Sequence, residues 1–340
     1  MLSDHMRAAT PPASILEVRD LVLASRKTGA ILVNGMSFTL NAGEILALVG
    51  ESGSGKSLTA LAVLGLLPAG VEQRGGRVLV DGQDVTGLLA AQRLRGSVLA
   101  AIFQDPQASL DPRWNVERFL VDRFMRLRAM EKRVARAAAA DILHQVGLHN
   151  PARVLRAYPH ELSGGMAQRV MIAGALAGGP RILIADEPTT ALDVTTQAQI
   201  LDLIRDIQAR TGLGIMMITH DLGVVAEISC RVMVLYGGRL MEQGNTAEVL
   251  EAPMHPYTSA LLAAMPDIDK DDPPVPIRQA RSDEVSASGC PFAPRCKRVL
   301  ASCHMVMPGP TLVRNGRSYA CHTRVEPLMK QATKLLRAHA

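Results

Sequence analysis

One glycine-rich loop near residue 50 constrains this chain more than any other stretch, because it matches G-x-x-x-x-G-K-[ST] at every fixed position. The apolar run at 45–49 predicts a buried strand before the loop, and the run at 58–64 predicts a helix after it. Strand, glycine loop and helix in this order form a phosphate cradle: the backbone wraps closely, and the helix N-terminus adds partial positive charge. The loop consists of Gly50, Glu51, Ser52, Gly53, Ser54, Gly55, Lys56 and Ser57.

Two side chains of this loop indicate what the phosphates belong to. Lys56 is placed to reach the β- and γ-phosphates of a nucleotide, and Ser57 is placed to hold Mg²⁺. The alternative is a Gly/Ser-rich turn between a strand and a helix that binds nothing. The match at every fixed position, with the correct flanks on both sides, favours the nucleotide site.

Length and composition limit where such a chain works. Its 340 residues suffice for one large domain with an extension, or for two domains. No apolar run approaches the roughly 18 residues that cross a bilayer, and the N-terminus lacks the features of a secretory signal. We therefore expect a cytosolic chain that reaches a membrane only through a partner. Aromatic residues are 3% of the chain, too sparse for a base-stacking surface, so no nucleic-acid partner is expected.

The apolar runs alternate with helical patterns after the loop, which predicts a mainly parallel sheet with ligands at the carboxyl ends of its strands. Four polar residues follow such strand ends and should converge on one edge: Gln104, Asp186, Glu187 and His220. Expected strands lie at 15–23, 31–40, 75–82, 98–103, 182–185 and 215–218, and helical periodicity covers 112–158 and 195–211.

The acidic pair after the run at 182–185 predicts chemistry at the γ-phosphate. Asp186 would bind Mg²⁺, directly or through water, and Glu187 would act as general base on the attacking water. The alternative is an acidic pair that merely ends a strand at the surface. The phosphate loop upstream favours the catalytic interpretation.

A second anion site is predicted at 162–165, where a serine and two glycines precede a helix. Ser163, Gly164 and Gly165 offer a hydroxyl, free N–H groups and the positive end of a helix dipole. The simpler alternative is an ordinary helix N-cap at Ser163. A second phosphate site is useful if two copies dock head-to-tail and each lends this helix end to the nucleotide of the other.

Taken together, these patterns resemble the nucleotide-binding subunits of ABC transporters over roughly residues 14–264. The resemblance implies that Gln104 contacts Mg²⁺ and the attacking water, that Asp193 lies at a dimer interface, and that His220 holds the γ-phosphate. It also implies nucleotide contacts from Ser163 to Gln168, which match the family's own signature LSGG-x-x-Q. The matching segments are Gly50–Ser57, Gln104, Leu162–Gln168, Asp186-Glu187, Ala191-Leu192-Asp193 and His220.

Further segments resemble the dipeptide, oligopeptide and nickel importer branch of this family. They are Leu162–Met166, Asp186–Asp193, His255-Pro256-Tyr257-Thr258 and Cys290–Cys296, while Leu64–Val71 is similar to nickel importers only weakly. The resemblance implies an α/β fold: a P-loop ABC ATPase with a mainly parallel core sheet, an antiparallel β subdomain, a helical insertion and a Cys-rich C-terminal extension. The expected ranges are 14–264 for the nucleotide-binding domain, about 107–178 for the helical insertion, 265–288 for a linker and 289–340 for the extension.

This branch implies an ATP-hydrolysing subunit that energises a dipeptide or oligopeptide importer. It implies as partners a second ABC ATPase subunit (favouring a heterodimer over a homodimer), two transmembrane permease subunits and a periplasmic or extracellular solute-binding protein. The location would be peripheral, on the cytoplasmic side of the inner membrane. The alternatives are a nickel or other small-solute importer, and a soluble non-transport ABC ATPase.

One position departs from the family pattern. The family usually places an aromatic side chain about 25 residues before the phosphate loop to stack on adenine, whereas this chain has Leu23-Ala24-Ser25-Arg26 there. Arg26, with its planar guanidinium, is the candidate for stacking on the base in its place.

Four of the five cysteines fall in the last fifth of the chain, a clustering that favours metal over disulfides in a cytosolic protein. Zinc sites favour tighter pairs than these, and four thiolates can also hold an iron–sulfur cluster. The resemblance implies a [4Fe-4S] cluster on Cys290, Cys296, Cys303 and Cys321; zinc and free or oxidised thiols stay open. We expect metal bonds to order this segment, since it has few apolar residues. Cys230 is expected to be a small core residue in a strand.

Overall fold

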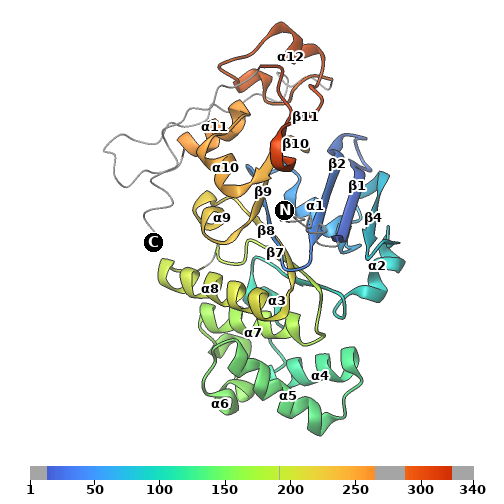
Figure 1. Ribbon diagram of the computed structural model, residues 1–340. Coiled ribbons are helices and arrows are strands. Elements are labelled where there is room, and N and C mark those ends of the chain that lie inside the picture. The colour runs from blue at the N-terminus through green and yellow to red at the C-terminus, as the bar shows by residue number, and fades with distance from the viewer. Residues whose placement is uncertain (1–13, 191, 265–287, 324–340) are drawn as a thin grey trace, which may run out of the picture.

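The computed structural model describes residues 14–190, 192–264 and 288–323, and two β-sheets organise it (Figure 1). A four-stranded antiparallel sheet has the order β2-β1-β4-β5, and an eight-stranded sheet has the order β11-β12-β10-β9-β3-β8-β7-β6. The first sheet comprises β1 (Ser14–Ser25), β2 (Ile31–Asn41), β4 (Val71–Val80) and β5 (Gln83–Asp84). The second comprises β3 (Ile45–Val49), β6 (Leu99–Ile102), β7 (Ile182–Asp186), β8 (Gly214–Thr219), β9 (Arg231–Tyr236), β10 (Arg239–Asn245), β11 (Thr311–Leu312) and β12 (Ser318–Tyr319).

The central strands form a parallel sheet because their sequences are apolar without alternation, as in strands covered on both faces. β3 pairs in parallel with β8 on one side and β9 on the other, and β7 joins β8 to β6. Along β3, Leu46 and Leu48 pack in the cluster beneath the antiparallel sheet, whereas Ala47 and Val49 face the opposite cluster. The mainly parallel core and the antiparallel sheet are therefore as predicted.

Helices cover one face of the core sheet, while α1 and the antiparallel sheet cover the other. Between the loop and the middle of the chain lie α1 (Lys56–Val63), α2 (Leu88–Leu94), α3 (Pro106–Ser109), α4 (Val116–Arg128), α5 (Lys132–Gln145) and α6 (Pro151–Arg156). They are followed by α7 (Gly164–Leu176), α8 (Val194–Thr211), α9 (Leu222–Ile228), α10 (Thr246–Glu251), α11 (Pro256–Ala263) and α12 (Ala301–Met305). The predicted helical stretch at 112–158 thus corresponds to α4–α6, at the lower end of the molecule in Figure 1.

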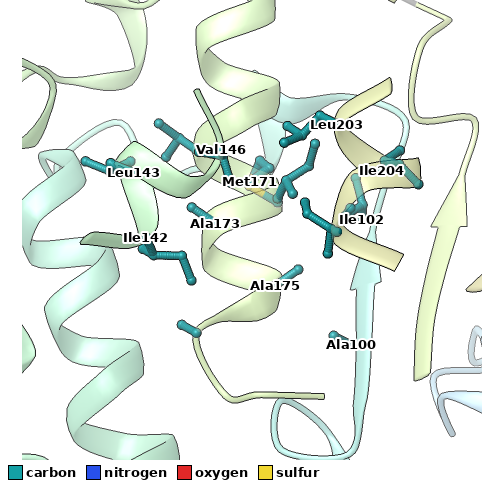
Figure 2. Packing of buried hydrophobic residues seen from close by; sticks show 14 of the residues in the cluster. Ala100, Ile102, Ile142, Leu143, Val146, Met171, Ala173, Ala175, Leu203 and Ile204 are labelled. Carbon is teal, nitrogen blue, oxygen red and sulfur yellow. The ribbon is translucent and has the colours of Figure 1, made fainter. Parts of the chain in front are cut away.

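α7 joins this helical part to the sheet, because apolar side chains line two of its faces. Met171 and Ala173 lie between Leu143 of α5 and Ile102 of β6 (Figure 2). Leu203 of α8 belongs to the same buried cluster. One apolar core therefore runs from α5 through α7 to the sheet, so α7 links the helical part firmly to the strands that carry the acidic pair.

The C-terminal part, residues 288–323, packs onto the core sheet rather than standing apart from it. β12 pairs antiparallel with β10, so that β12 and β11 form one edge of the eight-stranded sheet. Phe292 is buried against Tyr236 and Tyr257, and it shares an apolar cluster with Val232 and Val234 of β9. This segment was expected to have too few apolar residues to order itself, yet it shares the hydrophobic core of the main domain. Its dependence on metal stays a prediction.

Some sequence-based expectations change or fall outside the described residues. The expected linker at 265–288 lies outside them except for its last residue, as does the end of the expected extension beyond 323. Cys230 is exposed and lies just before β9, so the prediction of a core residue was wrong. Within the described ranges, none of the helices combines the length and apolar character needed to span a bilayer.

Candidate nucleotide site

The loop at 50–57 lies between β3 and α1, and its shape depends on glycine. Gly50 has φ of 152°, and a Cβ there would lie 2.1 Å from the Leu235 carbonyl oxygen at the end of β9. Gly55 has φ of 96° and forms the N-cap of α1, with no side chain bonded to the helix's first N–H groups. The predicted arrangement of strand, loop and open helix N-terminus is confirmed, and such an arrangement binds anions.

Lys56 lies inside this loop with only 7% of its surface exposed. Its Nζ donates to the carbonyl oxygens of Gly50 at 2.7 Å and Glu51 at 2.9 Å, and to Ser54 Oγ at 3.3 Å. Burial lowers the pKa of Lys56, although the negative charges of Glu187, Asp186 and Glu51 oppose that shift. The ammonium is thus held at the centre of the loop by the backbone that would surround a phosphate.

Ser57 and Asp186 meet across the start of α1 and the end of β7. Ser57 Oγ donates to Asp186 Oδ1 at 3.2 Å, although 129 residues separate them in sequence. Burial raises the pKa of Asp186, the Ser57 hydrogen bond lowers it and the neighbouring Glu187 raises it, with a net upward shift. The two predicted Mg²⁺ ligands are therefore adjacent and offer the hard oxygen donors that this ion prefers.

Glu187 stands at the centre of a hydrogen-bond network at the carboxyl edge of the sheet. Gln104 Nε2 donates to its Oε2 at 3.1 Å, and His220 Nδ1 lies 3.0 Å from its Oε1. Burial raises the pKa of Glu187, but the hydrogen bonds from His220 and Thr190 outweigh this, so the pKa is lowered and the carboxylate is ionised at neutral pH. The predicted convergence of Gln104, Glu187 and His220 is confirmed.

Two features of Glu187 were not predicted from the sequence. Thr190 Oγ1 donates to Glu187 Oε2 at 2.8 Å, three residues along the same turn. The backbone of Glu187 has φ of 48°, a region in which a residue other than glycine costs about 1–3 kcal/mol. Its N–H donates to the Ile218 carbonyl of β8 at 2.8 Å, which holds the turn in place. The position of this carboxylate is therefore fixed from both its backbone and its side chain.

Ser163 and Asp193 line a separate surface pocket of about 670 Å³ together with Gly164 and Gly165. Ser163 is the N-cap of α7, and its Oγ accepts from the Met166 N–H at 3.3 Å. None of the described residues that line this pocket belongs to the loop at 50–57. Within one chain, the two predicted anion sites therefore stay apart.

Gln168, which belongs to the same signature, lies elsewhere. It is 1% exposed inside α7, and its Nε2 has no hydrogen-bond partner among the residues that the structure describes. The structure thus separates Gln168 from the surface pocket at Ser163. The nucleotide contact that the resemblance implies for Gln168 stays a prediction.

The candidate for base stacking lies at the exposed ends of β1 and β4. Arg26 Nη1 lies 3.7 Å from the Glu72 carboxylate, and its Nε donates to the Val71 carbonyl at 3.4 Å. Glu72 and Val71 thus contact the Arg26 guanidinium along one edge. Its stacking role stays a prediction.

The C-terminal part also contacts the loop, which the sequence alone did not predict. Arg295 donates from both Nη atoms to the Glu51 carboxylate, at 2.6 and 2.7 Å, although 244 residues separate the pair. Tyr257 accepts a hydrogen bond from the Glu51 N–H at 2.9 Å. Hydrogen bonds from Arg295 to Glu51 and Tyr236 raise the pKa of its guanidinium, despite its burial. No spacing pattern could have revealed this contact, because it depends on how the C-terminal part folds back.

The four C-terminal cysteines line one small pocket, together with His322. Burial raises the pKa of Cys290 to about 11, and the other three thiols contribute to this shift. However, in the ranges that the structure describes, no three His, Cys, Asp or Glu side chains are grouped so that they could hold a metal ion. The cavity measures about 10 Å³, about the least that holds one water. The clustering of the thiols is confirmed, but the predicted metal site is not.

Comparison with known proteins agrees with this geometry. The ABC transporter family matches residues 33–190, and the family described as the oligopeptide/dipeptide transporter C-terminal region matches 241–303. The chain is 41% identical to the dipeptide transport ATP-binding protein DppD of Bacillus subtilis over 90% of this chain and 94% of that protein. It is 43% identical to the oligopeptide transport ATP-binding protein OppD of Mycobacterium tuberculosis over 90% of this chain and 51% of that protein.

Solved structures support the same assignment. The CbiO1 protein of Clostridium perfringens, part of an ABC transporter complex, has a TM-score of 0.61 and 29% identity, over 69% of this chain and 90% of that one. A dimeric ATP-binding cassette in a post-hydrolysis state with ADP and Pi has a TM-score of 0.58 and 27% identity, over 68% of this chain and 98% of that one. The chain therefore belongs to the family of ABC transporter ATP-binding proteins, in the branch that carries the oligopeptide/dipeptide transporter C-terminal region, and it is an ATPase.

Proposed function

We propose that this chain binds and hydrolyses ATP to energise the import of dipeptides or oligopeptides. The observation that carries the hydrolytic part is the Glu187 carboxylate, ionised and fixed by Gln104, Thr190 and His220. The match of residues 241–303 to the transporter C-terminal region, and the names of the two relatives compared above, support peptides as the solute.

Each residue of the site has a role in this proposal. The loop N–H groups and Lys56 bind the phosphates, while Ser57 and Asp186 hold Mg²⁺, which neutralises phosphate charge when bound. Glu187 takes a proton from the attacking water, Gln104 orients that water, and His220 contacts the γ-phosphate. Because Glu187 is already paired with Gln104 and His220, all three groups are prepositioned for this step.

A second ATPase domain completes the site in this proposal. The pocket at Ser163, Gly164, Gly165 and Asp193 is open, is formed by a helix N-terminus, and lies apart from the chain's own phosphate loop. Two domains docked head-to-tail would place each such pocket against the other's nucleotide. We propose a second, similar ATPase as the partner, together with two permease subunits and a solute-binding protein, at the cytoplasmic face of the inner membrane.

The test is reconstitution of the transporter with its permeases in proteoliposomes. The binding protein is added on the side of the membrane opposite to the ATPase. Addition of a di- or oligopeptide should stimulate ATP hydrolysis and drive ATP-dependent peptide uptake, and Lys56→Ala should abolish both. Stimulation by nickel or another small solute, but by no peptide, would assign the complex to another importer class. ATP hydrolysis without any association with permeases would instead favour a soluble ABC ATPase.

We also propose that Cys290, Cys296, Cys303 and Cys321 bind a [4Fe-4S] cluster. The support is chemical: four thiols from separate turns face one pocket, and thiolate is the ligand that such clusters use. The turns that carry the thiols would have to move apart to admit it. Anaerobic purification with elemental analysis should find about four iron and four sulfide per chain; zinc without sulfide, or no metal, would overturn the proposal.

A further inference from the structure

We propose that the C-terminal part supports the phosphate loop, and that Arg295 is a positioning residue for nucleotide binding through its ion pair with Glu51. This inference rests on the proposed role of the loop at 50–57 as the phosphate site. Three contacts of Glu51 carry it. The Glu51 carboxylate pairs with Arg295, its backbone N–H donates to Tyr257, and its carbonyl accepts from Lys56.

The ion pair between Arg295 and Glu51 has the geometry of a strong contact. The two Nη atoms donate in parallel to the two carboxylate oxygens, the bidentate arrangement that adds direction to charge. The Arg295 side chain is 5% exposed and that of Glu51 is 34% exposed, so the guanidinium is shielded from solvent and the carboxylate is only partly open to it. A pair this shielded is screened less by salt than a surface ion pair.

The Arg295 side chain is itself held rigidly. Its guanidinium carbon lies 5.3 Å from the ring centre of Tyr236 and 5.8 Å from that of Phe292, and Nη1 donates to the Tyr236 hydroxyl at 2.9 Å. Tyr236 ends β9, and the loop's Gly50 packs against the residue before it. The Arg295 guanidinium is therefore held in place by aromatic residues of the core, and it contacts Glu51 from this fixed position.

A second contact holds the same residue by its backbone. The Tyr257 hydroxyl accepts from the Glu51 N–H, and the Tyr257 ring packs against Tyr236 with their centres 4.6 Å apart. Tyr257 is fully buried and is the second residue of α11. Both the main chain and the side chain of Glu51 are therefore bound by residues within 241–303, the range that matches the transporter C-terminal region.

Glu51 connects this support to the phosphate-binding lysine. Lys56 Nζ donates to the Glu51 carbonyl, so the position of this carbonyl sets one of the bonds that hold the ammonium. The Glu51 carboxylate is also a negative charge in a loop that must accept a triphosphate. Pairing with Arg295 neutralises it and holds it away from the phosphates, whereas an unpaired carboxylate could turn toward them and repel them.

The experiment measures Mg²⁺–ATP affinity of the full chain at equilibrium for the variants Arg295→Gln, Glu51→Gln and the double variant. Arg295→Gln should weaken affinity about tenfold, which corresponds to about 1.4 kcal/mol, because it leaves the loop carboxylate unpaired. Glu51→Gln should weaken it less, since it loses the support but also removes the repulsive charge. The double variant should bind better than Arg295→Gln alone, and this rescue is the signature of positioning.

A role for Arg295 only in folding would leave the Mg²⁺–ATP affinity of the folded chain unchanged in Arg295→Gln. Lys297→Gln is the matched control, because it removes an exposed positive charge two residues away, and its affinity should equal the wild-type value. Affinity unchanged in Arg295→Gln, or losses that simply add in the double variant, would overturn the proposal. Lys56→Ala tests the phosphate site separately: if it binds as tightly as wild type, the site assignment fails whatever Arg295 does.

Discussion

Replacing Glu187 by Gln should slow ATP turnover in the assembled transporter by about 10²-fold or more, the usual scale for removing a positioned general base. The change keeps the shape of the side chain and removes its charge. A factor of 10² corresponds to about 2.7 kcal/mol in the barrier. Loss of a single hydrogen bond in the Glu187 network costs about 0.5–1.5 kcal/mol, and a glutamine carbonyl can still accept from Thr190. The predicted effect is therefore larger than structural disturbance can account for.

The assay pairs turnover with nucleotide affinity. Glu187→Gln should bind ATP as well as wild type, because the loop and Lys56 are untouched and the removal of one nearby negative charge favours the anion. Glu251→Gln, at the exposed end of α10, is the matched control and should leave both quantities unchanged. A positioned general base contributes about 10²-fold or more to the rate. If Glu187→Gln turned over within about twofold of wild type, the general-base role would be refuted.

Three further predictions follow from other parts of the structure. Ser163→Arg should leave this chain's own ATP affinity nearly unchanged but abolish hydrolysis at the partner's site, and damage confined to the isolated chain would contradict head-to-tail docking. Arg317→Met should lower the free energy of unfolding by about 3 kcal/mol in chemical denaturation, because it leaves the fully buried Glu242 carboxylate without its cation; an unchanged midpoint would refute this. The folded pKa of Glu187 is lowered, so its carboxylate stays ionised until the pH falls below the ordinary value of 4.5. A pH–rate profile should therefore show no loss of rate from this group near neutrality. A fall in rate with an apparent pKa near 7 that disappears in Glu187→Gln would contradict the shift.

Local patterns predicted most of the site because its parts lie at strand ends. Gly50–Ser57, Gln104, the acidic pair and His220 each follow an apolar run, and parallel strands bring their carboxyl ends to one edge. Once the runs at 45–49, 98–103, 182–185 and 215–218 are recognised, the convergence of Gln104, Glu187 and His220 follows from topology alone.

The features that sequence reasoning missed depend on contacts with no local signal. Arg295 meets Glu51 only because β12 joins β10 and the C-terminal part returns to the end of β9. The packing of the cysteine segment was missed for the same reason: its own apolar residues are few, but Phe292 packs in the core of the main domain. The burial of the Gln168 side chain inside α7 is likewise not encoded in the signature motif, and its nucleotide contact stays a prediction.

The position of β3 has a consequence for how this chain folds during synthesis. This early strand lies between β8 and β9, whose residues follow it by more than 160 positions. At a synthesis rate of about 5–20 residues per second, β3 and the loop after it wait roughly ten seconds or more for their neighbours. Until then, an apolar strand with two unpaired edges is exposed, a state that invites aggregation. We therefore expect ribosome-associated chaperones to hold the N-terminal half of this chain, and the ATP site to be completed only after the C-terminal part has emerged.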